Sequence, residues 1–361
     1  MSENNEIQMD PIQNGGSTEV KGSSTESSSV KSTNESKFNL DVKEFLKTYK
    51  YEILLGIIIV GSIIFKLWNE KNNIMKYFNT KPDLNAIYES KKIPKIIWMY
   101  WNDPIEKAPE IVQMCVNLIK KFNKDFKINL LNENSYKEYV QDEEIIKIMN
   151  SKLNHNYKSD LLRLYLVYNY GGIYTDSSTL PFQSFEWIIN LMNKSPKDLL
   201  MYKNNHHTTD KNKPICENWM IVSKKNNPVI EIIMDNFKLS LLNGPINSYK
   251  SLIKDNTVNY QNFISHGPFH LAYFVIANTL QKNNLHDKIE YLDCSYNSFP
   301  CMTIPNNLIL NKIFLSKYED NFEDFRDKNK FMKLTSYNRK YIEYYDIKPN
   351  EGSLVDLLLK M

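Results

Sequence analysis

The stretch Ser159–Ser178, SDLLRLYLVYNYGGIYTDSS, sets a helix directly against a short strand. The part that follows Ser159, which can cap a helix, is apolar nearly all round and predicts a buried helix. Gly171 is expected to end this helix, and Ile173–Thr175 predicts a short strand. Because two glycines join the two elements, the backbone can turn tightly and a ligand can approach it closely.

Segments on both sides of this stretch extend the α/β pattern. Buried-strand patterns occur at Lys95–Trp101 and Phe126–Leu131, and a helix that Pro109 opens separates them. Strand, helix and strand at this spacing predict a βαβ unit and a mostly parallel sheet. Further strands and helices are expected at Leu199–Tyr202, Trp219–Val222, Pro228–Leu242 and Pro268–Gln281. The predicted fold class is α/β, with a mostly parallel, twisted sheet flanked by helices.

The composition bounds the kind of protein. A chain of 361 residues can form one large domain or two small ones and can bury a sizeable core. A formal net charge of +3 excludes a protein built mainly around a polyanion, so no nucleic-acid partner is expected. Four cysteines in this length exclude a scaffold held together by disulfides.

The N-terminal part of the chain predicts a membrane anchor. Residues 1–40 are almost free of large apolar side chains, and residues 1–50 are expected to form a disordered polar tail. The uncharged apolar run Ile53–Phe65 follows, and Tyr51 and Trp68 bracket it in the way that aromatic residues mark membrane interfaces. As a helix, residues 51–68 are roughly 27 Å long, which favours a transmembrane helix over a detached core helix.

The rest of the chain divides by composition. Residues 69–92 are expected to be a polar stem, residues 93–310 the main folded domain, and residues 311–361 a C-terminal extension with a weaker pattern. Lysines lie on both sides of the anchor, so charge bias does not set its orientation. A single early span before a long folded domain favours a type II, single-pass protein with a cytoplasmic tail. Its membrane would be that of the Golgi or ER in a eukaryote, or the plasma membrane in a bacterium.

Three charged residues form the candidate site. Asp160 and Arg163 are three positions apart on one predicted helix and therefore share a face. Charges in an apolar helix are costly unless they are paired or used. Asp176 follows at the carboxyl end of the short strand, where ligands bind in open α/β sheets. Two interpretations remain open: a ligand site, or a plain buried ion pair with Asp176 capping a turn.

These motifs resemble a known family. Ser159–Ser178 is similar to the DxD-type sugar-binding region of glycosyltransferase family 32. IPKIIWMYWNDPIEKAPEIVQMCVNLIKKFN at Ile93–Asn123 resembles the opening of the capsular polysaccharide synthesis proteins, and the likeness extends to Ala277. The resemblance implies a GT-A fold, a nucleotide-sugar donor, a retaining transfer of a hexose, and a glycan, glycolipid or glycoprotein acceptor.

The resemblance also implies roles for individual residues. Asp160 and Arg163 match positions that contact the donor sugar, and Asp176 matches the first Asp of the DxD; we take these three as the candidate catalytic residues. The wider donor-binding set adds Trp98, Tyr100, Trp101, Gly172 and Tyr174. The aromatic side chains of the first strand are either stacking surfaces for the base and ribose or ordinary core residues.

The resemblance further implies Mn²⁺ or Mg²⁺ at Asp176. The second carboxylate of the DxD is replaced by Ser178, and a hydroxyl is a weaker ligand for a hard cation. Asp103 or the pair His266 and His270 are further candidate ligands, with His266 expected to face the donor phosphates and His270 to pack. A cation must face the leaving diphosphate, and two sources stay open: a metal ion at Asp176, or Lys and Arg groups.

The absence of the second DxD carboxylate, which Ser178 replaces, is also consistent with a different function. A chain that retains the fold but has lost metal-dependent chemistry through Ser178 would be a catalytically inactive, glycosyltransferase-like protein that binds sugar or acts as a scaffold. Turnover of a nucleotide sugar distinguishes this alternative from a membrane-anchored glycosyltransferase.

Overall fold

The computed structural model describes residues 47–78, 92–255, 257–260, 263–294 and 306–361. The chain divides into two compact units, Met1–Glu70 and Lys71–Met361. Most of the predicted tail at 1–50 and of the predicted stem at 69–92 lies outside the described residues.

The described part of the first unit consists mainly of the helix α2 (Lys50–Phe78), which continues past the unit boundary and contains the predicted anchor at 51–68. Many of its apolar side chains are exposed, among them Leu54, Ile57, Ile63 and Phe65. By length and hydropathy, none of the helices in the described ranges qualifies as a membrane span. The predicted transmembrane anchor is therefore not confirmed.

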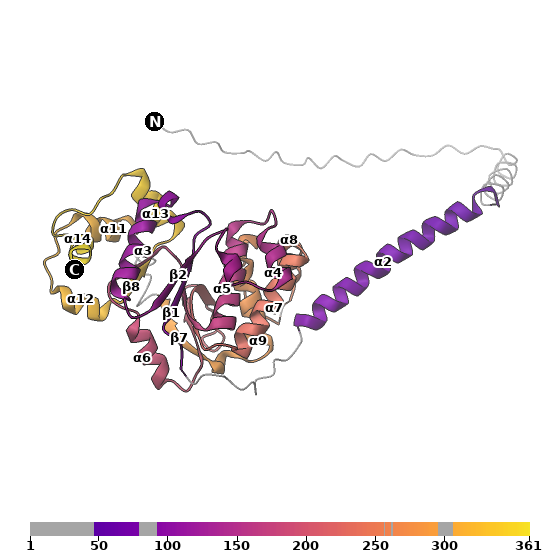
Figure 1. Ribbon diagram of the computed structural model, residues 1–361. Coiled ribbons are helices and arrows are strands. Elements are labelled where there is room, and N and C mark those ends of the chain that lie inside the picture. Colours follow the sequence, from indigo (N-terminus) through magenta and orange to yellow (C-terminus); the bar gives the residue numbers. More distant parts are fainter. Residues whose placement is uncertain (1–46, 79–91, 256, 261–262, 295–305) are drawn as a thin grey trace, which may run out of the picture. The chain divides into compact units, whose positions relative to one another are not determined.

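The second unit is built around a six-stranded sheet (Figure 1) with the order β2–β1–β3–β6–β5–β7. The strands are β1 (Ile96–Tyr100), β2 (Lys127–Leu131), β3 (Gly172–Thr175), β5 (Leu199–Lys203), β6 (Cys216–Ser223) and β7 (Ile289–Asp293). β1 pairs in parallel with β2 and β3, and β5 pairs in parallel with β7. β6 is antiparallel to both β3 and β5. The mostly parallel sheet is confirmed, and the reversed strand β6 was not foreseen because a hydrophobic run carries no direction.

Helices cover both faces of this sheet (Figure 1). Cores on the two faces follow from the alternation of strand side chains: Trp98 and Tyr100 pack into one, and Ile97 and Met99 into the other. The first core includes side chains of α4 (Glu143–Met149), α5 (His155–Tyr170), α7 (Pro228–Leu242), α8 (Pro245–Leu252) and α9 (Leu271–Lys282). The second includes side chains of α3 (Glu110–Phe122) and α6 (Glu186–Lys194). Short 3₁₀ turns lie at η1 (Ile105–Lys107), η2 (Tyr136–Glu138), η3 (Ile264–His266), η4 (Pro268–His270) and η5 (His286–Lys288).

The helix and turn predicted within Ser159–Ser178 form nearly as expected. α5 begins one turn earlier than predicted, because the side chain of Asn154 caps it by accepting a hydrogen bond from the Asn156 amide. Ser159 therefore lies inside the helix, where its hydroxyl is available to Arg163. Gly172 has a φ of +97°, and a Cβ there would lie 2.5 Å from the Ile96 carbonyl oxygen. The glycine is needed because β1 and β3 approach closely at this point.

The residues after 310, expected as an extension, pack on α3. Their elements are β8 (Phe331–Lys333), α12 (Phe322–Lys328), α13 (Ser336–Tyr344) and α14 (Leu354–Lys360), and α11 (Asn306–Leu315) runs into them. β8 pairs antiparallel with β4 (Thr179–Pro181), which follows Asp176 closely in the chain. A hydrophobic core shared by α3, β4 and these elements fixes the pairing. The C-terminal residues thereby bring Lys333 next to the candidate site.

Candidate functional site

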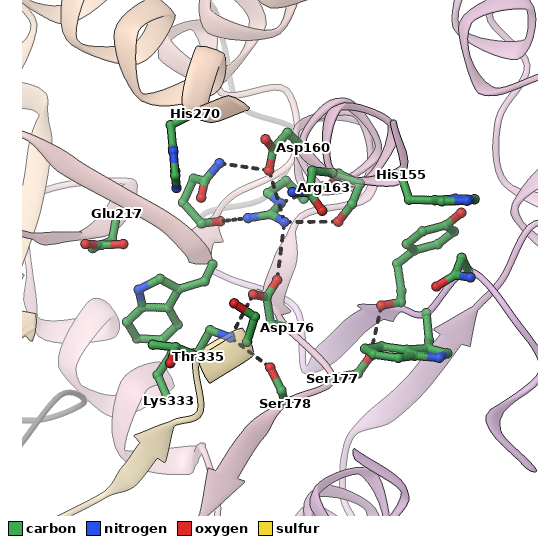
Figure 2. A pocket seen from close by; sticks show the side chains of 18 of the residues that line it. His155, Asp160, Arg163, Asp176, Ser177, Ser178, Glu217, His270, Lys333 and Thr335 are labelled. Atoms are coloured by element: carbon green, nitrogen blue, oxygen red, sulfur yellow. Dashed lines mark hydrogen bonds and ion pairs between the residues drawn. The ribbon is translucent and has the colours of Figure 1, made fainter. Parts of the chain in front are cut away.

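A cleft of about 320 Å³ lies at the carboxyl ends of β1 and β3. Side chains from α5, from the end of β3, from β6 and from the start of α13 line it (Figure 2). The carboxyl ends of parallel strands are where ligands bind in open α/β sheets. The position predicted from the sequence and the position of the cleft therefore agree.

Arg163 connects the other two residues predicted to form the site, Asp160 and Asp176. Its Nη2 lies 3.1 Å from Asp160 Oδ1 and 3.2 Å from Asp176 Oδ1. Its Nη1 donates a 2.6 Å hydrogen bond to the carbonyl oxygen of Asn218 on β6. The Ser159 hydroxyl accepts a further bond of 3.0 Å from Nη2. The guanidinium is thus held in one orientation, with a carboxylate on either side of it (Figure 2).

Asp160 is buried in the wall of the cleft. Its Oδ1 also accepts a hydrogen bond of 3.0 Å from the amide of Asn218. Burial raises the pKa of Asp160 above its ordinary value, although Arg163 opposes the shift. Asp160 and Arg163 therefore form the buried ion pair that the sequence left open, and the same pair lines the cleft.

Asp176 lies between two cations. Its second oxygen, Oδ2, is 3.0 Å from the Lys333 ammonium (Figure 2). Burial alone would raise the pKa of Asp176, but Lys333 and Arg163 outweigh burial and hold the pKa below its ordinary value. Asp176 is therefore the ionised carboxylate at the centre of the site.

The Ser178 hydroxyl faces the same cations. It accepts hydrogen bonds of 2.8 Å from Lys333 Nζ and 3.1 Å from Arg339 Nη1, and it donates one of 3.1 Å to the Leu334 carbonyl. The ammonium of Lys333 thus bridges Asp176 and Ser178, which are the two side chains expected to hold a divalent ion.

The donor set does not fit such an ion. Both oxygens of Asp176 contact cationic groups, and no second carboxylate replaces Ser178. Within the described ranges, no three His, Cys, Asp or Glu side chains are arranged to hold a metal. Neither Asp103 nor His266 lines the cleft: Asp103 bonds Asn102, and the His266 ring stacks on Phe263 at 4.5 Å between centroids. His266 was expected to face the donor and His270 to pack, and the structure instead places His270 in the cleft lining.

The aromatic residues of β1 divide between core and cleft. Tyr100 and Trp101, at the carboxyl end of the strand, line the cleft. The buried hydroxyl of Tyr100 has no hydrogen-bond partner among the described residues. Trp98 lies two residues deeper and is 1% exposed. Its indole N–H donates to the Gly171 carbonyl at 2.9 Å, so its predicted contact with the donor is wrong and it belongs to the core.

Two further residues of the predicted donor-binding set also lie outside the cleft lining. Gly172 sits at the opposite end of β3 from Asp176, where close packing on Ile96 explains the glycine. Tyr174 is fully buried, and the Arg163 guanidinium lies over its ring at 4.8 Å. Burial raises the pKa of Tyr174 to about 12, so its hydroxyl stays neutral. Tyr174 positions Arg163 rather than touching a ligand in the cleft.

The sequence analysis missed Lys333, Arg339 and Glu217. Glu217 lies on β6, and its carboxylate accepts hydrogen bonds of 2.6 Å from Tyr273 and 2.6 Å from Asn204. Burial raises the pKa of Glu217 above its ordinary value. Lys333 and Glu217 each carry a charge inside an apolar strand pattern, FMKL and CENWMIV. Such a charge is costly unless it is paired. Lys333 and Glu217 in their strands therefore carry the same signal that predicted Asp160 and Arg163 in the helix.

Comparisons with known proteins show what the chain is similar to. A family model described as "Capsular polysaccharide synthesis protein" matches residues 62–346. Inositol phosphoceramide mannosyltransferase 1 of Schizosaccharomyces pombe is 29% identical, over 34% of this chain and 44% of that protein. The chain thus spans less than half the length of this curated relative.

Two solved structures resemble the chain at low identity. PaToxG Glycosyltransferase is 15% identical with a TM-score of 0.34, covering 62% of this chain and 93% of its own. Mouse xyloside xylosyltransferase 1, in its apo form, is 10% identical with a TM-score of 0.36, covering 68% of this chain and 99% of its own.

The mixed α/β fold with its mostly parallel sheet agrees with the fold class expected from the sequence. The chain belongs to the capsular polysaccharide synthesis protein family, because the family model matches well over half of it. The resemblance stated for Ile93–Ala277 is thereby confirmed.

Proposed function

We propose that this protein transfers a hexose from a nucleotide-sugar donor to a hydroxyl group of a glycan, glycolipid or glycoprotein. The observation that carries the proposal is the cluster of Asp160, Arg163 and Asp176 in the wall of a polar cleft at the carboxyl ends of β1 and β3. The family match and the mannosyltransferase relative support it.

The cleft residues suggest how a donor would lie. The ionised Asp176 and the amide of Asn218 offer hydrogen-bond partners to sugar hydroxyls on one side of the cleft. Tyr100 and Trp101 line the cleft near the end of β1 and offer aromatic surface suited to the base and ribose. Fixing the donor in this way contributes to the rate by positioning.

The proposed reaction exchanges one bond to the anomeric carbon for another. The bond between this carbon and the β-phosphate oxygen breaks, and its electron pair stays on the phosphate. The acceptor oxygen bonds to the same carbon on the face that the phosphate leaves, and the acceptor proton moves to the departing phosphate oxygen. This front-face course needs no enzyme nucleophile and retains the anomeric configuration.

A screen of nucleotide sugars against the full chain tests the proposal. We expect at least one donor to release its nucleoside diphosphate slowly in water and faster when acceptor glycans are added. Release is followed by phosphate-coupled assay, and the anomer of the product by NMR. Saturable binding of a nucleotide sugar with no turnover of any donor, with or without acceptor, would instead favour the inactive, sugar-binding alternative.

We further propose that residues 51–68 attach the chain to a membrane as a type II protein, with the N-terminal tail in the cytoplasm. The exposed apolar side chains of α2, such as Ile57 and Phe65, support attachment. The full chain should remain in the membrane pellet after alkaline carbonate extraction, and a variant lacking residues 51–68 should be released. Release of the full chain itself would contradict this proposal.

A further inference from the structure

We infer that Lys333 and Arg339 supply the positive charge that faces the donor diphosphate, in place of a divalent metal ion. The inference rests on the proposed function, because it concerns the diphosphate of a nucleotide sugar. It assigns a binding role to two residues of the C-terminal segment, 311–361, which the sequence had indicated only as an extension.

Lys333 takes the position expected for the metal. Its ammonium lies 3.0 Å from Asp176 Oδ2 and 2.8 Å from Ser178 Oγ, so it bridges the two side chains of the degenerate DxD. Its third bond, of 3.0 Å, goes to the Leu334 carbonyl. All three donors of the ammonium are used, which fixes a buried positive charge beside the cleft. A hydroxyl at Ser178 can accept a bond from an ammonium, whereas a carboxylate would suit a metal ion better.

Arg339 is placed to contact the phosphates directly. Nη1 of its guanidinium bonds Ser178, and the group lies over the Trp101 ring at 5.7 Å. Within the described part of the chain, its side-chain hydrogen bonds, to Ser178 and to the Leu334 carbonyl, come from Nη1 and not from Nε or Nη2, and Arg339 lines the cleft. A guanidinium with two adjacent N–H groups to offer suits bidentate binding of a phosphate. Lys333 therefore supplies a fixed positive charge beside the cleft, and Arg339 binds the phosphates of the leaving group.

The charges of the site agree with this assignment. Three cations, Arg163, Lys333 and Arg339, line or border the cleft together with three carboxylates, Asp160, Asp176 and Glu217, and burial raises the pKa of both Asp160 and Glu217. Burial also lowers the pKa of Lys333, and Asp176 opposes that shift. Lys333 and Arg339 both bond Ser178, so positive charge is gathered on this side of the cleft, where it attracts a diphosphate and repels an added divalent cation. As the bond to the anomeric carbon breaks, the electron pair left on the β-phosphate faces this charge.

The first test measures binding of nucleoside diphosphates to the full chain by calorimetry. UDP, GDP, ADP and CDP serve as probes, in EDTA and in Mn²⁺. At least one should bind in EDTA about as tightly as in Mn²⁺. Arg339→Gln should weaken this binding by roughly 10- to 100-fold, the size expected for losing a charge-assisted hydrogen bond. Lys333→Met should also weaken it, because it removes a positive charge beside the diphosphate without removing a hydrogen bond to it. Lys340→Met removes an exposed charge from the same helix as Arg339 and should leave binding unchanged.

A second variant separates a binding role from a structural one. Lys333→Met combined with Ser178→Asp removes the bridging ammonium and restores the carboxylate. We expect this double variant to bind the diphosphate in Mn²⁺ and to lose it in EDTA. Arg339 is partly exposed, so Arg339→Gln keeps the test available if Lys333→Met fails to fold.

The outcomes distinguish this inference from the proposed function. Binding and transfer by the unaltered chain that need Mn²⁺ or Mg²⁺ would overturn the inference and leave the proposed function standing. Unchanged binding by Arg339→Gln in EDTA would also overturn it. If no diphosphate binds under either condition and no donor is turned over, the proposed function itself fails.

Discussion

Replacement of Asp176 by asparagine is expected to lower kcat/KM for sugar transfer by about 10³-fold, because positioning of the reacting groups is lost. Asp176 is the carboxylate whose pKa Lys333 and Arg163 hold low against the effect of burial, so it is the charged acceptor in the cleft. An amide of the same shape keeps the packing but offers one acceptor in place of two. It also leaves Arg163 and Lys333 without their shared partner. Initial rates with the donor found in the screen measure the effect.

The nucleoside diphosphate and the sugar should respond differently to Asp176→Asn. The variant loses a negative charge, so binding of the free diphosphate should stay within about 5-fold of the unaltered protein or tighten. Asp287→Asn is the matched control, since the Asp287 side chain is 68% exposed and is not part of the cleft lining. A kcat/KM for Asp176→Asn equal to that of Asp287→Asn would remove Asp176 from the site.

The sequence predicted the part of the site that lies in one continuous stretch. The buried helix, the two glycines and Asp176 follow one another between Ser159 and Ser178, so spacing alone places them near the end of a strand. Helical periodicity put Asp160 and Arg163 on one face, and the structure joins them at 3.1 Å. These features depend on local geometry, which a sequence carries directly.

The rest of the site depends on which strands become neighbours. Lys333 reaches Asp176 because β8 pairs with β4, more than a hundred residues away in the chain. The residue pattern of neither short strand, β4 or β8, indicates which strand it pairs with. In the same way, depth along β1 separates Trp98 from Trp101, and the sequence does not show where the strand leaves the core.

Replacement of Arg163 by methionine is expected to destabilise the folded protein by about 3–5 kcal/mol, because removing one partner of a buried ion pair leaves uncompensated charge. Arg163 is nearly fully buried and contacts both Asp160 and Asp176. Methionine has a similar length and no charge, so the change removes the ionic contacts more than the packing. A decrease of roughly 10 °C in the unfolding midpoint corresponds to this loss.

The loss of stability in Arg163→Met should depend on pH, and the pKa of Asp160 determines the direction of that dependence. The pKa of Asp160 is already raised in the folded state, so its folded form binds a proton more tightly than the unfolded chain does. Stability from this group is present at low pH and is lost as the pH rises from the unfolded pKa through the folded one. Without Arg163 the pKa of Asp160 rises further, so the variant's loss of stability should be larger at neutral pH than at mildly acidic pH.

Two comparison variants decide whether charge causes the loss in Arg163→Met. Lys95→Met breaks an ion pair with Glu186 in which both side chains are 40% exposed or more, and it should cost under about 1 kcal/mol. Arg163→Met combined with Asp160→Asn removes one of the stranded carboxylates and should recover part of the lost stability at neutral pH. Thermal unfolding followed by circular dichroism measures all of them. If the double variant is no more stable than Arg163→Met at any pH, the loss arises from packing, and the ionic account of this cluster is wrong.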